Sequence, residues 1–426
     1  MDEFDFTIIG AGVSGLFTAI EIIKEKPGVK ILIMEKGPSF DDRTESDVYN
    51  GFGGLGISEG KYNFSVDFGG DLVDKIGLQN TTYYLSKVEE YLNEFNGKDS
   101  LDYQSHYFQA PDESEIRFID NKVKHLGRKL SKEVIKNIFN YLVENNTQVI
   151  NSVNILGIEK KNSKFLIKIE GVENSIISRN LIIATGINSD FVTNLSDKFQ
   201  LTKEKSRVDF GLRMEMPSNQ LNQILGDDLE VKMFYKDLYT YCMNKNGNII
   251  PKKMLGFSLA DGQNYREGKI SDNLNFCLFK PYYFEDEPHL LNYLNNMMEK
   301  INKASDELIG QKLSNFDPYF KEKNTISKSM NYRESDLYNY LPEDLLNDTK
   351  GFLHELDELL DEDIEGNSIL YGIDIKFHSP KIKTDPVFQS SVEGLYFVGD
   401  CSGVTYSLSH AAASGIYLGR QMVHDI

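Results

Sequence analysis

The first residues that could do chemistry are three glycines and one acid near the start of the chain. Gly10, Gly12 and Gly15 form the pattern G-x-G-x-x-G, and Glu35 follows twenty residues after the last glycine. In such a turn the first glycine permits a sharp change of direction, the second lets the backbone approach a pyrophosphate, and the third lets a helix pack closely on a strand. The carboxylate stands where a ribose-binding acid is expected. These residues predict a site for an adenine dinucleotide.

Two predicted strands and a helix position these residues. Residues 4–9 and 30–34 are apolar runs typical of buried strands, and residues 16–24 carry a helical apolar pattern. Val13 and Ser14 would begin the helix, where free N–H groups and the helix dipole favour a pyrophosphate. The order of strand, glycine turn, helix and strand makes this prediction more specific than the glycine pattern alone.

Two cations and a second glycine-rich segment follow the acid. Lys36 and Arg43 could contact a ribose or phosphate of the cofactor, with a surface position as the alternative. Residues 51–61 are dense in glycine, which indicates a backbone that passes close to another group or adopts positive φ. We expect this segment to contact the dinucleotide, with a flexible surface loop as the alternative. Its residues assigned to the cofactor are Gly53, Gly54, Ser58 and Lys61.

The next part of the chain predicts two helices and a small sheet. Residues 82–95 and 131–143 have amphipathic patterns and are expected to pack on the nucleotide-binding sheet. Short apolar runs between residues 149 and 184 predict a β-meander. The strands expected there are residues 153–158, 165–169 and 181–183. The cofactor-binding residues expected in this region are Val149, Ala184, Thr185 and Gly186.

The end of the chain carries another buried strand followed by small residues. Residues 394–398 predict the strand, which leads into Gly399 and Asp400. Residues 410–416 predict a helix whose small side chains allow close approach to a sheet or ligand. Before this part, strand patterns between residues 208 and 281, and helical patterns at residues 287–301 and 341–360, predict a second domain.

Composition restricts the class of protein. With 46 basic and 65 acidic residues the formal net charge is −19, which disfavours nucleic acid and anionic membrane surfaces as partners. The first residues are acidic and Glu21 interrupts the first apolar run, unlike a signal peptide, and no other stretch predicts a transmembrane helix. The expected location is the cytoplasm.

Cysteine and histidine usage excludes two further kinds of chemistry. Cys242, Cys277 and Cys401 are far apart and form no C-x-x-C motif, which fits a reducing compartment and excludes a redox disulfide of the thioredoxin-reductase type. The seven histidines form no pattern typical of a metal site, so no metal is expected. Cys401 is expected to be a small packed residue rather than a redox thiol.

Three separate motifs form a recognisable set: the glycine turn with Glu35, the tripeptide Ala184-Thr185-Gly186, and the dipeptide Gly399-Asp400. This set resembles the signatures of FAD-dependent oxidoreductases with the glutathione-reductase-like flavin fold. More narrowly, residues 53–61 and 403–415 are similar to those of a poorly characterised bacterial family of FAD-dependent dehydrogenases, the NAD(P)/FAD-dependent oxidoreductases. The resemblance covers most of the chain and is weakest over residues 285–350.

The resemblance implies an FAD site. The residues that it places at the flavin end are Gly399, Asp400, Leu408, Ser409 and His410. Asp400 would accept a hydrogen bond from a ribityl hydroxyl. The backbone of residues 408–410, at a helix N-terminus, would face the N1 and C2 carbonyl edge of the flavin and stabilise the negative charge of reduced flavin. Family members often carry a glycine-rich tripeptide after the Gly-Asp pair, and this chain has Cys401-Ser402-Gly403 instead.

The implied fold class is α/β: a Rossmann-like FAD-binding domain with a β-meander and an inserted α+β substrate or cap domain. The FAD-binding domain would comprise residues 1–206 and 369–426, and the substrate or cap domain residues 207–368. A second G-x-G-x-x-G between strands is missing, which argues against a separate NAD(P)H domain.

The expected function is transfer of a hydride between flavin N5 and a small organic substrate, with NAD(P)H as a candidate transient electron donor. The alternatives are a flavin-dependent monooxygenase and a non-catalytic FAD-binding or sensing protein. A polar side chain near the flavin would handle any proton. The catalytic candidates are Tyr265, His378 and His410, with Tyr241 and Tyr406 as further possibilities.

Overall fold

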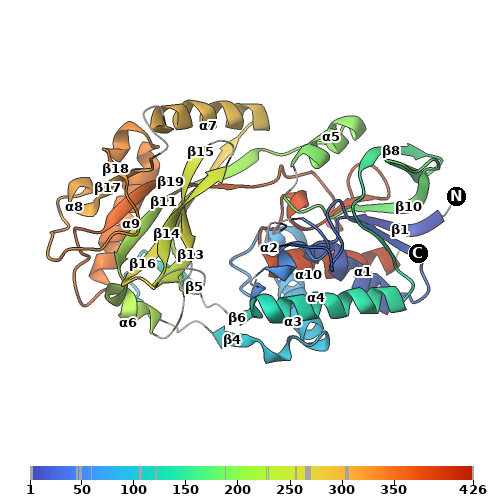
Figure 1. Ribbon diagram of the computed structural model, residues 1–426, viewed down its shortest axis with the longest axis horizontal. Coiled ribbons are helices and arrows are strands. Elements are labelled where there is room, and N and C mark those ends of the chain that lie inside the picture. Colours follow the sequence, from blue (N-terminus) through green and yellow to red (C-terminus); the bar gives the residue numbers. More distant parts are fainter. Residues whose placement is uncertain are drawn as a thin grey trace. The chain divides into compact units, whose positions relative to one another are not determined.

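The computed structural model of the 426-residue chain is shown in Figure 1. It describes residues 3–44, 47, 50–58, 60–104, 108–119, 122–187, 189–226, 228, 230–254, 257–263, 270–302 and 307–424. The chain forms two compact units. The first unit contains Met1–Tyr103, Lys122–Lys205 and His378–Ile426, and the second contains Gln104–Asn121 and Ser206–Phe377.

The first unit is built on a sheet whose central strands run parallel. The strand order is β7 (Gln148–Ile150), β2 (Ile31–Met34), β1 (Glu3–Ile9) and β10 (Ile176–Ile183), and β20 (Leu395–Phe397) pairs in parallel with β10. Both faces of such a sheet are buried, which explains the continuous apolar runs. The parallel core and the glycine turn after β1 confirm the Rossmann-like α/β class.

The β-meander predicted from the sequence is also present. β8 (Ile155–Lys161), β9 (Lys164–Ile169) and β10 are antiparallel neighbours that extend the same sheet. The Lys161–Lys164 connection is a tight turn in which Asn162 and Ser163 adopt positive φ. The two expected strands at residues 153–158 and 165–169 are therefore confirmed, with small shifts at their ends.

Four helices cover the parallel sheet and share its core. They are α1 (Val13–Glu25), α3 (Leu78–Glu94), α4 (Gly127–Glu144) and α10 (Leu408–His424). α1 and α10 come from opposite ends of the chain and lie side by side (Figure 1, blue and red). A Cβ atom on Gly415 would collide with the Ser14 carbonyl, and one on Gly419 would meet α1 at Thr18 and Glu21. The small residues of α10 therefore allow close packing against α1.

The second unit is built on a sheet with one apolar face, in which all pairs are antiparallel except β17 with β18. Its strand order is β18 (Arg333–Glu334), β17 (Ile309–Lys312), β19 (Ile369–Phe377), β11 (Ser206–Pro217), β16 (Asn273–Phe284), β13 (Leu238–Lys245), β12 (Lys232–Tyr235) and β5 (Arg117–Ile119). A separate hairpin consists of β14 (Asn248–Met254) and β15 (Phe257–Gln263). α7 (Glu287–Asn302) and α9 (Glu343–Glu358) contribute to the same hydrophobic core, which confirms both predicted helices.

Alternation along β11 gives the sheet two different faces. Val208, Phe210 and Leu212 point into the hydrophobic core. Because successive side chains of a strand point to opposite faces, Asp209 and Arg213 point to the other side. The face of β11 opposite the hydrophobic core therefore carries charged side chains, and Asp209 and Arg213 are buried there.

The remaining elements are short. They are α2 (Leu72–Ile76), α5 (Ser189–Phe199), α6 (Asn222–Leu225), α8 (Leu313–Phe316), β3 (Lys61–Asn63), β4 (Leu101–Gln104), β6 (Lys122–His125) and the 3₁₀ turns η1 (Gly54–Ile57), η2 (Gly97–Asp99), η3 (Ser218–Leu221), η4 (Leu337–Asn339) and η5 (Gly399–Ser402). Among the described residues, no helix combines the length and the hydropathy needed to cross a bilayer.

The division into units differs from the expected domain boundaries in two places. The second unit ends at Phe377 instead of residue 368, because β19 pairs along its length with β11 and also with β17. Residues Gln104–Asn121, expected in the FAD-binding domain, belong to the second unit, because β5 pairs with β12. Neither pairing has a local sequence signal, since each joins strands that are far apart in the chain.

Candidate functional site

The three glycines of the turn after β1 have different surroundings. Gly10 has a φ of 105°, and a Cβ atom there would collide with the Ala184 carbonyl. A Cβ atom on Gly15 would collide with the Gly10 carbonyl. A Cβ atom on Gly12 would meet no atom within 4 Å. Gly10 and Gly15 therefore allow close packing, whereas Gly12 borders open space at the N-terminus of α1.

The Glu35 carboxylate accepts hydrogen bonds from three backbone segments around this turn. Its Oε2 accepts from the Ala11 N–H at 2.8 Å, and its Oε1 accepts from the N–H groups of Gly37 at 2.8 Å and Gly51 at 3.2 Å. The residue is only 9% exposed. The carboxylate that the sequence places at a ribose is thus held rigidly beside the glycine turn, while Lys36 next to it is exposed.

The segment Gly51–Ser58, which we call the glycine-rich loop, packs against the same turn. The Gly53 N–H donates to the Ala11 carbonyl at 2.8 Å, and a Cβ atom on Gly54 would lie 3.2 Å from the Gly12 Cα. Phe52 is fully buried and packs edge-on against Phe139 of α4. The loop is therefore packed rather than a loose surface segment, and its contact with a cofactor stays a prediction.

Arg43 binds the glycine-rich loop. Its Nη1 donates to the carbonyls of Phe52 at 2.8 Å and Gly54 at 3.0 Å, and its Nη2 donates to the Asp47 carbonyl at 2.6 Å. Burial lowers the pKa of the guanidinium, and the nearby Glu35 partly opposes this. The sequence suggested that Arg43 contacts a ribose or phosphate, or lies on the surface. Its bonds to backbone carbonyls were not predicted, because the spacing of residues does not show how the loop folds back on Arg43.

Three other residues assigned to the cofactor lie on elements around the turn. Ser58 donates through its hydroxyl to the Leu55 carbonyl at 2.6 Å, which closes η1. Lys61 begins β3 and pairs in register with His125. Val149 is the middle residue of β7 and pairs with Ile33. Their contacts with a cofactor stay predictions.

The tripeptide after β10 continues beside the glycine turn. The Ala184 N–H donates to the Ile9 carbonyl at 2.8 Å. Gly186 has a φ of 65°, and a Cβ atom on it would meet nothing within 4 Å. The Thr185 hydroxyl is buried and lies beside the Cys401 thiol. Gly12 and Gly186 thus both border open space.

The Gly399-Asp400 pair reaches the first turn of α1. Gly399 has a φ of 72°, and a Cβ atom on it would collide with the Ser14 hydroxyl. Asp400 accepts from the Thr405 hydroxyl at 2.8 Å and is half-buried. Burial raises the pKa of the neighbouring Cys401 thiol to about 12, which fits a packed thiol rather than a nucleophile.

The N-terminus of α10 carries two buried polar side chains. Ser409 and His410 are fully buried, and neither Ser409 Oγ nor His410 Nδ1 has a hydrogen bond among the described residues. The His410 Nε2 lies 2.9 Å from the Ser65 carbonyl and must carry the proton to donate to it. Burial lowers the pKa of His410, so the ring is held neutral. Leu408 is the first residue of the helix.

The remaining catalytic candidates that the structure describes are divided between the two units. His378 packs edge-on against Tyr406 with ring centroids 5.2 Å apart, both in the first unit. Tyr241 belongs to the second unit, where the amines of Lys376 and Lys232 lie 4.2 and 5.0 Å from its ring centroid. Tyr265 lies outside the described residues.

The second unit also contains a buried charged cluster that the sequence patterns did not predict. Arg213 is fully buried, and its Nη2 donates to Asp374 at 2.9 Å and its Nη1 to Asn275 Oδ1 at 3.1 Å. On the same face, Asp209 accepts from Arg207 through two bonds and from the Tyr239 hydroxyl. The signal in the sequence was a set of charged residues on one face of β11, at positions 207, 209, 213 and 215, with Gly211 between them.

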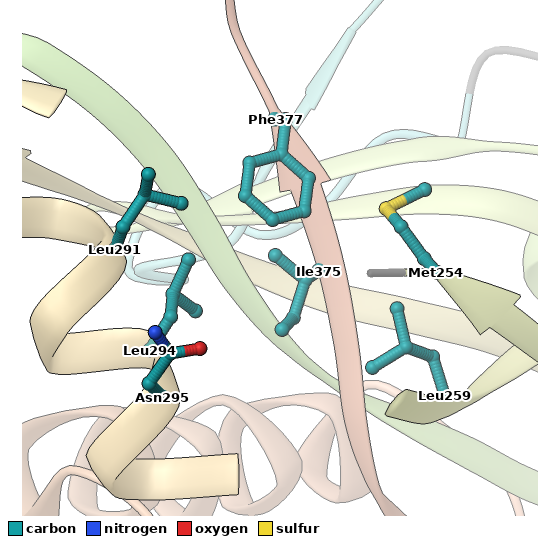
Figure 2. A pocket seen from close by; sticks show the side chains of 7 residues that line it. All are labelled: Met254, Leu259, Leu291, Leu294, Asn295, Ile375 and Phe377. Carbon is teal, nitrogen blue, oxygen red and sulfur yellow. The ribbon is translucent and has the colours of Figure 1, made fainter. Parts of the chain in front are cut away.

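An apolar crevice also lies on the second unit. Figure 2 shows it between α7, the β14–β15 hairpin and β19. It is lined by Met254, Leu259, Leu291, Leu294, Asn295, Ile375 and Phe377. None of these side chains titrates, so the crevice offers no acid–base chemistry. The described residues also contain no group of three metal-ligating side chains that could hold an ion.

The chain was compared with known proteins. No protein-family model and no curated protein matches it. Among solved structures, a variant of E. coli quinol fumarate reductase FrdA aligns with 99% of this chain and 70% of its own, at 14% identity and a TM-score of 0.44. Glycine oxidase from Geobacillus kaustophilus aligns with 100% of this chain and 95% of its own, at 11% identity and a TM-score of 0.44. A flavoprotein/dehydrogenase from Cytophaga hutchinsonii aligns with 100% and 78%, at 12% identity and a TM-score of 0.40. At these values the alignments carry no functional argument.

Proposed function

We propose that the chain is an FAD-dependent oxidoreductase whose first unit binds FAD and whose second unit recognises a small organic substrate. One observation carries this proposal: the open space at Gly12, in front of the N-terminus of α1. The glycine-rich loop, the Ala184-Thr185-Gly186 tripeptide and Gly399 all pack against the turn or helix that borders this space. A pyrophosphate fits there because backbone N–H groups and the helix dipole favour an anion.

The acid beside this space has capacity for a ligand. An ionised carboxylate offers about four lone-pair sites. Glu35 uses three of them on the N–H groups of Ala11, Gly37 and Gly51. About one site is left for a ribose hydroxyl. The three N–H bonds fix the orientation of the carboxylate, so binding would need little rearrangement.

The C-terminal segments suit the flavin end of the cofactor. Asp400 would accept from a ribityl hydroxyl. The first turn of α10 would present its N–H groups, and the buried Ser409 hydroxyl lacks a partner in the described structure. The positive end of the helix would stabilise negative charge on the cofactor ring. When bound, FAD supplies the two-electron chemistry, and the protein residues bind it and exclude competing reactions.

The second unit offers the polar side chains for a substrate. Arg207, Asp209 and Tyr239 form a hydrogen-bonded group on the face of β11 and β13 opposite the hydrophobic core. Lys376 and Tyr241 are close neighbours on this face. Such a rigid set of charged and hydroxyl groups suits recognition of a small polar molecule. We assign the substrate to this face and leave NAD(P)H as the candidate transient donor.

The absorbance spectrum of the purified protein tests the proposal. The expected result is a flavin spectrum that bleaches when NADPH, NADH or a substrate is added without oxygen. Bleaching by one pyridine nucleotide would identify an NAD(P)H-fed enzyme, and oxygen consumption tied to substrate would identify a monooxygenase. Flavin that no donor reduces would favour the non-catalytic alternative. A colourless protein that does not take up FAD would refute the proposal.

A further inference from the structure

The guanidinium of Arg43 lies under the glycine-rich loop and donates to its carbonyls. We propose that Arg43 is a positioning residue: it holds the loop in its shape against the glycine turn and acts on FAD through the loop, without touching FAD. This inference rests on the proposed function. It differs from the ribose or phosphate contact suggested by the sequence.

The contacts of Arg43 explain why the loop needs a cation. One guanidinium nitrogen, Nη1, lies within 3.4 Å of the carbonyl oxygens of Gly51, Phe52 and Gly54. These three oxygens therefore converge on one point, and their partial negative charges repel one another. Arg43 offsets this repulsion with a positive charge and donates to several acceptors at once.

The conformation of the loop explains why its carbonyls converge. Gly51, Gly53 and Gly54 have φ values of 97°, 90° and 49°, in the left-handed region that glycine adopts without strain. These left-handed residues bend the loop so that the carbonyls of Gly51, Phe52 and Gly54 face the guanidinium. Without the guanidinium, the Gly51 carbonyl would keep the Gly54 N–H at 3.0 Å, but the Phe52 carbonyl would lose its Arg43 donor at 2.8 Å. Loss of a donor to a buried acceptor is costly.

The opposite side of the loop is the side that meets the cofactor site. The Gly53 N–H donates to the Ala11 carbonyl, and Gly54 lies against Gly12. The Gly51 N–H donates to Glu35. The glycine-rich loop is therefore held between Arg43 on one side and the glycine turn after β1 on the other. Loss of the guanidinium would loosen the backbone that borders the open space at Gly12.

Amide hydrogen exchange of the full-length protein without FAD tests this role directly. In Arg43→Gln we expect exchange at residues 52–58 to be at least about tenfold faster, while amides of β8 and β9 keep their wild-type rates. Arg43→Lys should restore only part of the protection, because one ammonium does not match several carbonyls in the plane of a guanidinium. Arg179→Gln is the matched control, since Arg179 is 59% exposed and pairs with Glu3.

FAD binding gives the second readout. We expect the Kd for FAD to rise about tenfold in Arg43→Gln, in step with faster exchange of the loop. A higher Kd with unchanged exchange would show direct contact with FAD and overturn the proposal, as would full protection in Arg43→Lys. Should Arg43→Gln fail to fold, Arg43→Lys carries the same comparison. If the wild-type protein binds no FAD, the proposed function fails, and the exchange data still decide whether Arg43 holds the loop.

Discussion

The Glu35 carboxylate accepts a hydrogen bond from the Ala11 N–H at 2.8 Å, which joins the end of β2 to the glycine turn after β1. The two strands are parallel neighbours, with Ile9 paired to Met34, so their carboxyl ends lie at the same edge of the sheet. Ligands of open α/β sheets bind at this edge. The bond therefore fixes the acid where a dinucleotide would lie, before any ligand arrives.

We predict that Glu35→Ala weakens FAD retention severalfold. The substitution removes the ribose acceptor and leaves the N–H groups of Ala11, Gly37 and Gly51 without their partner. We also expect a loss of about 1–3 kcal/mol in the free energy of unfolding, from the unpaired donors. Flavin content after purification and titration of the FAD-free protein measure retention. Glu159→Ala, at an exposed position on β8, is the control. Unchanged occupancy would rule out the ribose assignment.

Two glycines of the turn should respond differently to alanine. Gly10→Ala should reduce stability strongly, because φ is 105° and the new Cβ would collide with the Ala184 carbonyl. Gly12→Ala should keep the Tm of the FAD-free protein, since its Cβ meets nothing within 4 Å, but should block the pyrophosphate. Thermal unfolding and FAD titration separate the two effects. Normal FAD affinity in Gly12→Ala would show that the open space does not hold the cofactor.

Asp400→Ala tests the flavin end of the site. We predict a lower flavin content or a shifted flavin absorbance, because the carboxylate would no longer accept from a ribityl hydroxyl. The Thr405 hydroxyl also loses its acceptor, at 2.8 Å in the structure. Thr405→Val therefore serves as the control for this internal bond alone. Wild-type spectrum and affinity in Asp400→Ala would count against the ribityl assignment.

The parts of the fold and site that the sequence predicted are those with local patterns. The βαβ unit around Gly10, the β-meander and the helices rest on periodicity within short windows, so they could be read before the structure was known. The small residues around Gly415 predicted close approach to a sheet or ligand; their packing against α1 was not predicted. The βαβ unit, the β-meander and the helices could be predicted because each leaves a pattern within a short stretch of sequence.

The parts that the sequence did not predict depend on contacts between distant segments. β5 joins the second unit through pairing of Ile119 with Lys232, and no local pattern connects these positions. Arg43 binds carbonyls of a loop whose shape arises from three left-handed glycines. Arg213 meets Asp374 only because β19 pairs beside β11. The contacts of β5, Arg43 and Arg213 thus depend on long-range strand pairing and on loop shape, which no short stretch of sequence shows.

His410 should make stability depend on pH. Burial lowers the pKa of its ring below the ordinary value of about 6.5. Between the folded and unfolded pKa values the unfolded chain binds more protons, so this contribution is complete above about pH 6.5 and is lost as the pH falls toward the folded pKa. The slope is at most about 1.4 kcal/mol per pH unit.

Urea unfolding measures this effect. It is carried out at several pH values between about 5 and 7.5, which span the ordinary pKa of histidine. His410→Asn should flatten the pH dependence in this window. His289→Asn is the control, because His289 is exposed and bonded to Asp286. An unchanged slope in His410→Asn would show that the ring does not titrate on unfolding.

The stability losses from single substitutions of Arg213 and Asp374, a buried pair, should add up to more than the loss from the double substitution. Asp374→Asn removes the nearer carboxylate from a fully buried guanidinium and leaves it only Asp261, at 3.6 Å. Loss of one member of a buried pair costs about 3–5 kcal/mol. Burial raises the pKa of Asp374, and Arg213 opposes this, so the two charges depend on each other.

A double-mutant cycle with Arg213→Met and Asp374→Leu measures this dependence through urea unfolding followed by circular dichroism. We expect the double variant to be more stable than the sum of the single losses, because apolar side chains of similar volume need no partner. Asp363→Asn, which breaks the exposed pair with Lys323, should leave the free energy of unfolding nearly unchanged. Additive losses would show that the two side chains are stabilised separately by their other contacts, such as that of Arg213 with Asn275.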